Sequence, residues 1–118
     1  MWRMKREARQ LSVSIERAAQ EAYEFLCVPE NFPRWASGAA GRNVRFTERN
    51  SHGVLDHAVE TPEGTTVYVP LRVLPRGSGC ELELTLFRQP GMTEEKFAAD
   101  AEWVMRDLRE AKRLLESL

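Results

Sequence analysis

MTEEKFAADAEWVMRDLREAKRLLESL, residues 92–118, decides the fold because it predicts one long helix with a single apolar stripe. Thr93 suits the N-cap, and acidic residues fill the first turn while basic residues fill the later turns. The stripe consists of Phe97, Ala101, Val104, Met105, Leu108, Ala111, Leu115 and Leu118. Such a stripe has to pack on an apolar surface. We therefore predict that residues 93–117 form a helix on a curved antiparallel sheet, with a cavity or groove between them.

The N-terminal part of the chain predicts one strand followed by two short helices. Residues 10–16 alternate apolar with polar side chains, which is typical of a half-buried strand. Residues 17–35 change to helical spacing, and Pro29 stands where a second short helix can begin. Residues 1–9 are rich in basic side chains and predict a solvated tail, while the small residues 37–41 predict a linker.

The middle of the chain predicts antiparallel strands separated by turns. The segments with strand character are residues 44–48, 54–60, 65–74 and 80–88. Pro70 interrupts the third of these, and because proline cannot donate to a ladder we expect a bulge or a sheet edge there. Together with the first strand, the segments predict an α+β fold with a sheet of about five strands.

Composition sets limits on the class of protein. The chain has 118 residues, of which 42% are hydrophobic and 30% charged, so we expect one globular domain over residues 1–118. The net charge of −1 gives no reason to expect binding to nucleic acid, and no run approaches the roughly 20 apolar residues of a membrane span. Cys27 and Cys80 have no metal-ligand spacing, so we expect free thiols, a cytoplasmic protein, and neither metal nor cofactor.

Three stretches together resemble the START-like, or SRPBCC, superfamily, which includes the Bet v 1-like proteins. They are SVSIERAAQEAYEFLCVPENFPRW (residues 12–35), GVLDHAVETPEGTTVYVPLRVLP (53–75) and FRQPGMTEEKFAADAEWVMRDLREAKRLLE (87–116). The last two are similar to small bacterial members described as polyketide cyclases or dehydrases. The resemblance implies a helix-grip fold, in which a long C-terminal helix lies on a curved antiparallel sheet.

The chain departs from this family in the length of its sheet. The family normally has more strands after the paired helices than the four segments that follow Trp35 here. Part of the cavity wall is therefore expected to be missing, which favours a shallow open groove or a homodimer through an open sheet edge.

The residues expected to contact a ligand lie on the apolar faces of the sheet and helix. They are Trp35, Leu55, His57, Val59, Tyr68, Arg72, Leu84, Phe97, Ala101, Val104, Met105 and Leu108. His57 is either a polar group of the pocket or a core histidine bonded to a neighbouring strand or to Trp35. Trp35 is either a gate for ligand or a plug of the core. Tyr68 and Arg72 face solvent unless a bulge turns one of them inward.

Three functions are compatible with these residues. The first is binding of a small hydrophobic molecule, such as a lipid or a polyketide-like metabolite. The second is a cyclase or dehydrase, for which His57 is the one internal candidate for general acid or base. The third is a partner-binding module, because START-like domains include activators of chaperone ATPases and an open edge accepts a peptide strand. The first is the function we favour.

Overall fold

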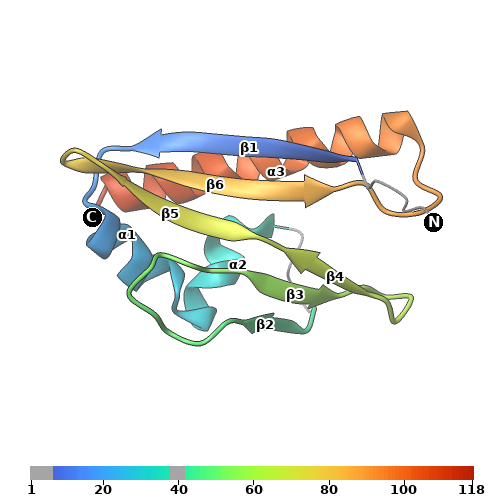
Figure 1. Ribbon diagram of the computed structural model, residues 1–118, viewed down its shortest axis with the longest axis horizontal. Helices are drawn as coiled ribbons and strands as arrows, with labels where there is room; N and C mark the ends of the chain where they lie inside the picture. The colour runs from blue at the N-terminus through green and yellow to red at the C-terminus, as the bar shows by residue number, and fades with distance from the viewer. Residues whose placement is uncertain (1–6, 38–41) are drawn as a thin grey trace, which may run out of the picture.

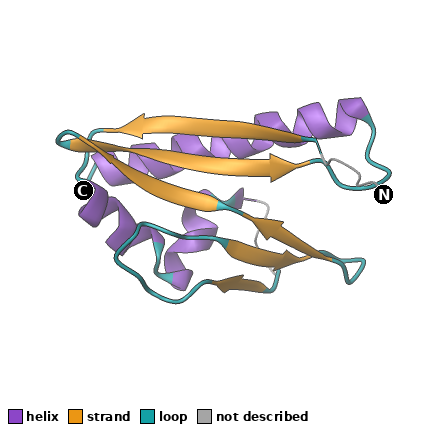
Figure 2. Cartoon of the chain, viewed as in Figure 1, coloured by secondary structure: helices purple, strands orange, loops and turns teal. Residues whose placement is uncertain are grey.

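The computed structural model describes residues 7–37 and 42–118, which form an α+β protein (Figure 1). The elements in chain order are β1 (Ala8–Ile15), α1 (Ala19–Leu26), η1 (Pro29–Asn31), α2 (Phe32–Trp35), β2 (Val44–Phe46), β3 (His57–Glu60), β4 (Thr66–Val69), β5 (Leu71–Arg76), β6 (Gly79–Phe87) and α3 (Glu94–Glu116). The long helix α3 runs alongside β1 (Figure 2). The predicted basic tail, up to residue 6, and most of the predicted linker, residues 38–41, lie outside the described residues.

Helix α3 confirms the prediction made from the C-terminal sequence. Thr93 is the N-cap, and its Oγ1 accepts the backbone N–H of Lys96 at 3.1 Å. The helix packs on β1 and on α2. Leu118, predicted to continue the apolar stripe, is instead 62% exposed because the helix ends at Glu116. Among the described helices, none has the length and apolarity needed to cross a bilayer.

Strand β1 begins earlier than the predicted start at residue 10. It pairs antiparallel with β6 along its whole length, from Ala8 opposite Phe87 to Ile15 opposite Cys80. The ladder extends this far because β6 continues to Phe87 and offers partners to the earlier residues. Arg9, predicted to belong to a solvated tail, is therefore part of the sheet, and its guanidinium lies 5.2 Å from the centre of the Phe97 ring.

Pro70 divides the predicted strand 65–74 into β4 and β5, because its ring nitrogen has no hydrogen to donate. The ladders are β1-β6-β5 and β2-β3-β4, so the described residues form six strands where we predicted about five. The two ladders still adjoin, since the Leu55 N–H donates to Leu71 O at 2.7 Å and the Thr85 N–H donates to Pro70 O at 3.0 Å.

Strand β3 is shorter than the predicted strand 54–60. Val54 forms only a single bridge, to Arg72. The reason is local, because the Asn50 side chain bonds to both backbone polar groups of Val54. Its Oδ1 accepts the Val54 N–H at 3.1 Å, and its Nδ2 donates to the Val54 carbonyl at 2.9 Å. Regular pairing with β4 therefore starts at His57.

The core lies between the helices and the inner face of the strands. Helices α1 and α2 contribute Ala22, Tyr23, Leu26, Phe32 and Trp35, while α3 contributes Leu108, Ala111 and Leu115. The strands contribute Ile15, Leu71, Val73, Cys80, Leu82 and Leu84. Phe97 and Ala101 are also buried, at 2% and 4% exposure, but they lie outside this cluster. The start of α3, at Phe97 and Ala101, therefore packs separately from the main core.

Candidate functional site

The inner face of β2, β3 and β4 follows from their register. His57 lies opposite Phe46 and Val69, while Val59 lies opposite Val44 and Val67. Because side chains alternate along a strand, these six residues share one face. At one end of this face, His57 is buried, and Phe46 and Val69 pack against the core. At the other end, Val44 also packs against the core, whereas Val59 and Val67 are half-buried and are not packed against it.

An aromatic cluster closes the end of the inner face beneath α2. The ring of Phe32 stands edge-on to Trp35, Phe46 and His57, at centroid distances of 5.1, 5.2 and 5.2 Å. Phe46 and His57 also contact each other, at 5.0 Å. The cluster fills the space beneath α2 with aromatic rings. Trp35 therefore lies in the core, which is the position expected of a core plug.

Trp35 and His57 do not bond to each other, which was one of the predicted readings of His57. The His57 Nδ1 lies 3.0 Å from the carbonyl oxygen of Leu55, two residues earlier. Trp35 is only 3% exposed, and its indole Nε1 has no hydrogen-bond partner among the described residues. Since buried polar groups are nearly always paired, this indole N–H is an exception that requires an explanation.

The hydrogen bond to Leu55 fixes the tautomer of His57. A carbonyl oxygen can only accept, so Nδ1 carries the hydrogen and Nε2 of the neutral ring is a bare acceptor. Burial lowers the pKa of His57, while the bond to Leu55 and the charge of Asp56 act in the opposite direction. His57 is therefore a neutral side chain at pH 7 with Nε2 able to accept a proton or a hydrogen bond.

Asp56 points to the outer face, opposite to His57, but it is nevertheless 6% exposed. Its carboxylate accepts hydrogen bonds from Arg72 Nε at 2.9 Å and Nη2 at 2.8 Å, from the Tyr68 hydroxyl at 2.7 Å, and from the backbone N–H of Leu71 at 2.9 Å. The bond to Arg72 is the largest cause that lowers the pKa of Asp56 to about 2. We call Asp56, Tyr68, Leu71 and Arg72 the outer clasp, since it joins β3 to both sides of the break at Pro70.

The outer clasp determines where two predicted ligand-binding residues lie. Tyr68 is 55% exposed and Arg72 is exposed, and both are directed at the Asp56 carboxylate. Neither is turned to the inner side by the irregularity at Pro70. The clasp was missed because its members are distant in sequence. The signal for it was the unusual combination of an acid, a tyrosine and an arginine on strands that flank a proline.

The other predicted residues divide into two groups. Leu55, Leu84 and Leu108 are 2%, 5% and 0% exposed and belong to the packed core. Val104 and Met105 are half-buried and pack against that core from α3. Val59 and its partner Val67, half-buried on the inner side of β3 and β4, form what we call the inner apolar surface.

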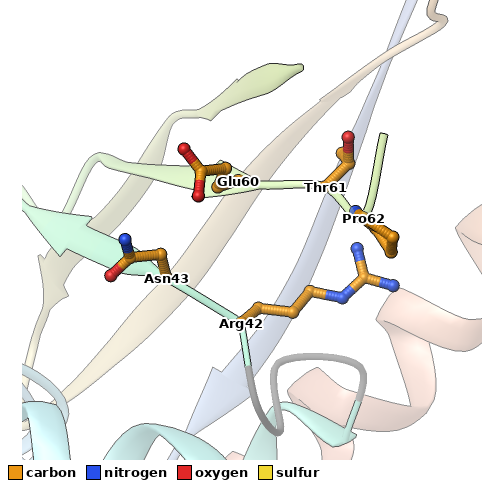
Figure 3. Close-up of a pocket in the computed structure, with 5 residues that line it drawn as sticks. All are labelled: Arg42, Asn43, Glu60, Thr61 and Pro62. Atoms are coloured by element: carbon orange, nitrogen blue, oxygen red, sulfur yellow. The ribbon is translucent and has the colours of Figure 1, made fainter. Parts of the chain in front are cut away.

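Two hollows on the described surface are polar and lie at the β2–β3 edge. The larger, of about 460 Å³, is lined by Arg42, Asn43, Glu60, Thr61 and Pro62 (Figure 3). The smaller, of about 50 Å³, is lined by Asn43, Arg45, Ala58, Glu60 and Thr66. Neither is lined by any residue predicted to bind ligand. The expected apolar space between sheet and helix is thus not one of these hollows.

Comparison with solved structures identifies the architecture. The chain matches the crystal structure of Ara h 8.0201 with a TM-score of 0.65 at 9% identity, covering 97% of this chain and 100% of that one. It matches a START superfamily protein from Mycobacterium smegmatis with a TM-score of 0.61 at 12% identity, covering 96% and 99%. The fold is the START-like helix grip. At such identities the likeness establishes the fold and not an activity.

A third similar structure comes from a biosynthetic pathway. It is the di-domain ARO/CYC protein BexL from the BE-7585A pathway, with a TM-score of 0.62 at 15% identity. The match covers 93% of this chain but 46% of BexL, so this chain spans about half of that protein. No family model matches the sequence. No curated protein matches it either.

Proposed function

We propose that this chain binds a small hydrophobic molecule on the inner apolar surface of β3 and β4. The observation that carries the proposal is the pair Val59 and Val67. They face each other in the β3–β4 ladder and point to the inner side, yet both are half-buried and unpacked against the core.

Burial of these valines is the expected source of affinity. Removing apolar surface from water contributes about 25 cal/mol per Å², or about 1.5 kcal/mol or more for a fully buried valine. A ligand that covers Val59 and Val67 completes an apolar layer that the described residues leave open. The aromatic cluster beneath α2 closes one end of the inner face, so the ligand is bound at the opposite end, at Val59 and Val67.

The test uses a neutral naphthylamine dye whose fluorescence rises in an apolar environment. Val67→Asp places a charge on the inner side, whereas Thr66→Asp places the same charge on the exposed neighbour in β4. We expect Val67→Asp to weaken dye binding by about tenfold or more, which corresponds to about 1.4 kcal/mol, and Thr66→Asp to leave it unchanged. Thermal melting of both variants checks that they are folded. Equal loss in both, or no dye binding by the wild-type chain, would refute the proposal.

A second candidate function is acid–base catalysis of the cyclase or dehydrase type. The favouring observation is His57, which is neutral and has Nε2 free to take a proton. With a candidate polyketone substrate, His57→Gln should abolish turnover while dye binding persists. Turnover that survives this substitution would remove the basis for catalysis.

A homodimer through an open sheet edge is a further proposal. Strand β1 is outermost in its ladder, and β2 is outermost in the other. Part of the β1 edge is already occupied, because Lys112 Nζ donates to the Ser14 carbonyl at 2.6 Å. Light scattering after size exclusion should give twice the chain mass. A strict monomer at high concentration would contradict the dimer without affecting ligand binding.

A further inference from the structure

The larger polar hollow adjoins the open end of the inner face of β2 and β3. The pairing of β2 with β3 continues beyond the start of β2, because the Glu60 N–H donates to the Asn43 carbonyl at 2.9 Å. The next pair in this register is Arg42 and Thr61, and both line the hollow. Thr61 lies two residues after Val59, which is about 6.6 Å along an extended strand, so the next inner-face position after Val59 is in the hollow.

Arg42 provides the positive charge of this hollow. Its side chain is exposed and extends toward Pro62 (Figure 3). No carboxylate of the described residues forms an ion pair with Arg42, whereas Arg72 is paired with Asp56 at 2.8 Å. The N–H groups of the Arg42 guanidinium are therefore open to a ligand at the edge of the inner apolar surface.

The other polar groups of the hollow limit which ligand group can bind. Thr61 Oγ1 accepts the N–H of Thr65 at 3.2 Å and lies 2.9 Å from its hydroxyl oxygen, so this hydroxyl is engaged within the turn. Alternation directs Glu60 to the outer face together with Ala58, and Glu60 lines the smaller hollow there as well. Its carboxylate adds a negative charge at the border of the larger hollow, which disfavours ligand groups that carry more than one negative charge.

A carboxylate fits these surroundings best. Its two oxygens match the two parallel N–H groups that a guanidinium presents, and it carries one negative charge. A phosphate monoester carries up to about two negative charges at pH 7 and would be repelled more strongly by Glu60. An uncharged amide can form hydrogen bonds but gains no attraction between opposite charges. The hollow, of about 460 Å³, has room for a carboxylate together with water.

We propose that the hydrophobic ligand carries a carboxylate group, which binds Arg42 in the larger hollow while the apolar body of the ligand covers Val59 and Val67. This inference rests on the proposed ligand binding and specifies the chemical class of the ligand, an apolar molecule with an acid group at one end. The net charge of the chain is −1, so a preference for an acid over a neutral analogue comes from the local charge of Arg42 and not from overall attraction.

Isothermal titration calorimetry tests the proposal with naphthoate and naphthamide, which have nearly the same size and differ in charge. At pH 7 and low salt, we expect the wild-type chain to bind naphthoate about fivefold more tightly than naphthamide, as for a favourable exposed ion pair. Arg42→Gln removes the charge and should abolish this preference. Arg45→Gln is the matched control, because Arg45 is an exposed arginine of β2 opposite Ala58, and it should retain the preference. Salt at about 0.5 M should reduce the preference of the wild-type chain, because exposed charges are screened.

The outcomes separate this inference from the proposed function. If the wild-type chain binds naphthoate and naphthamide equally, or if Arg42→Gln keeps the preference, the carboxylate inference is wrong while hydrophobic binding stands. If naphthyl phosphate binds more tightly than naphthoate and loses this advantage in Arg42→Gln, the acid group is a phosphate and the inference is also overturned. If neither these probes nor the neutral dye binds, the proposed function fails and the inference fails with it.

Discussion

The contacts of the outer clasp allow us to predict how much Asp56→Asn changes the free energy of unfolding. The substitution keeps the size of the side chain but removes the charge that Arg72, Tyr68 and Leu71 stabilise. The pKa of Asp56 is lowered from 3.8 to about 2, and each pKa unit corresponds to about 1.4 kcal/mol. The ionised carboxylate therefore stabilises the fold by about 2.5 kcal/mol at pH 7, and Asp56→Asn should lower the free energy of unfolding by about 2 to 3 kcal/mol.

The same pKa shift fixes how this loss depends on pH. Because the folded-state pKa lies below that of the unfolded chain, the stabilisation is complete above about pH 4 and disappears as the pH falls toward 2. Urea denaturation of wild type and Asp56→Asn at pH 7, 4 and 3 measures the difference directly. The two chains should differ most at pH 7 and approach each other at pH 3.

The control for this experiment is Glu60→Gln. Glu60 is an exposed acid at the end of β3, four residues after Asp56, so its substitution should change stability by less than about 0.5 kcal/mol at any pH. If Asp56→Asn also costs less than about 0.5 kcal/mol at pH 7, or if its cost does not shrink as the pH falls, the reasoning about the outer clasp is wrong.

Two further predictions concern packing and backbone conformation. Leu108 is fully buried, so Leu108→Ala should cost about 2 to 5 kcal/mol in urea denaturation, whereas Leu118→Ala, at an exposed site, should cost less than about 0.5 kcal/mol. Similar values for the two would show that α3 is not packed on the core as described. Gly53 has φ +72°, and a Cβ there would meet the Val73 carbonyl oxygen; Gly64 has φ +87° but open space around it. Gly53→Ala should therefore lower the melting temperature clearly more than Gly64→Ala, and the reverse order would contradict the close approach of these backbones.

Much of the fold could be predicted because its signals are local. The helix predicted at residues 93–117 is α3, since capping and apolar periodicity are read within a few turns. The strand predicted at 80–88 is β6, since alternation in Cys80, Leu82 and Leu84 reports a one-sided strand. Pro70 correctly indicated an irregularity in the predicted strand. It did not indicate that this irregularity would separate two ladders.

The candidate site was harder to predict because its features depend on contacts between distant residues. The unpaired indole of Trp35 and the contacts of Phe32 with Phe46 and His57 depend on how α2 sits on the sheet, which no local pattern specifies. The burial of Asp56 depends on Arg72, which lies far along the chain and across the break at Pro70. Alternation alone assigned Asp56 to an outer face without revealing that the outer clasp covers it.

The most direct test of the proposed ligand binding is methyl-group NMR of the chain during titration with the naphthylamine dye. We predict that the methyl signals of Val59 and Val67 shift together and saturate at the same dye concentration, because the two side chains face each other on the inner side of β3 and β4. Shifts confined to the outer face, at Ala58 or Thr66, with the inner valines unchanged, would contradict it.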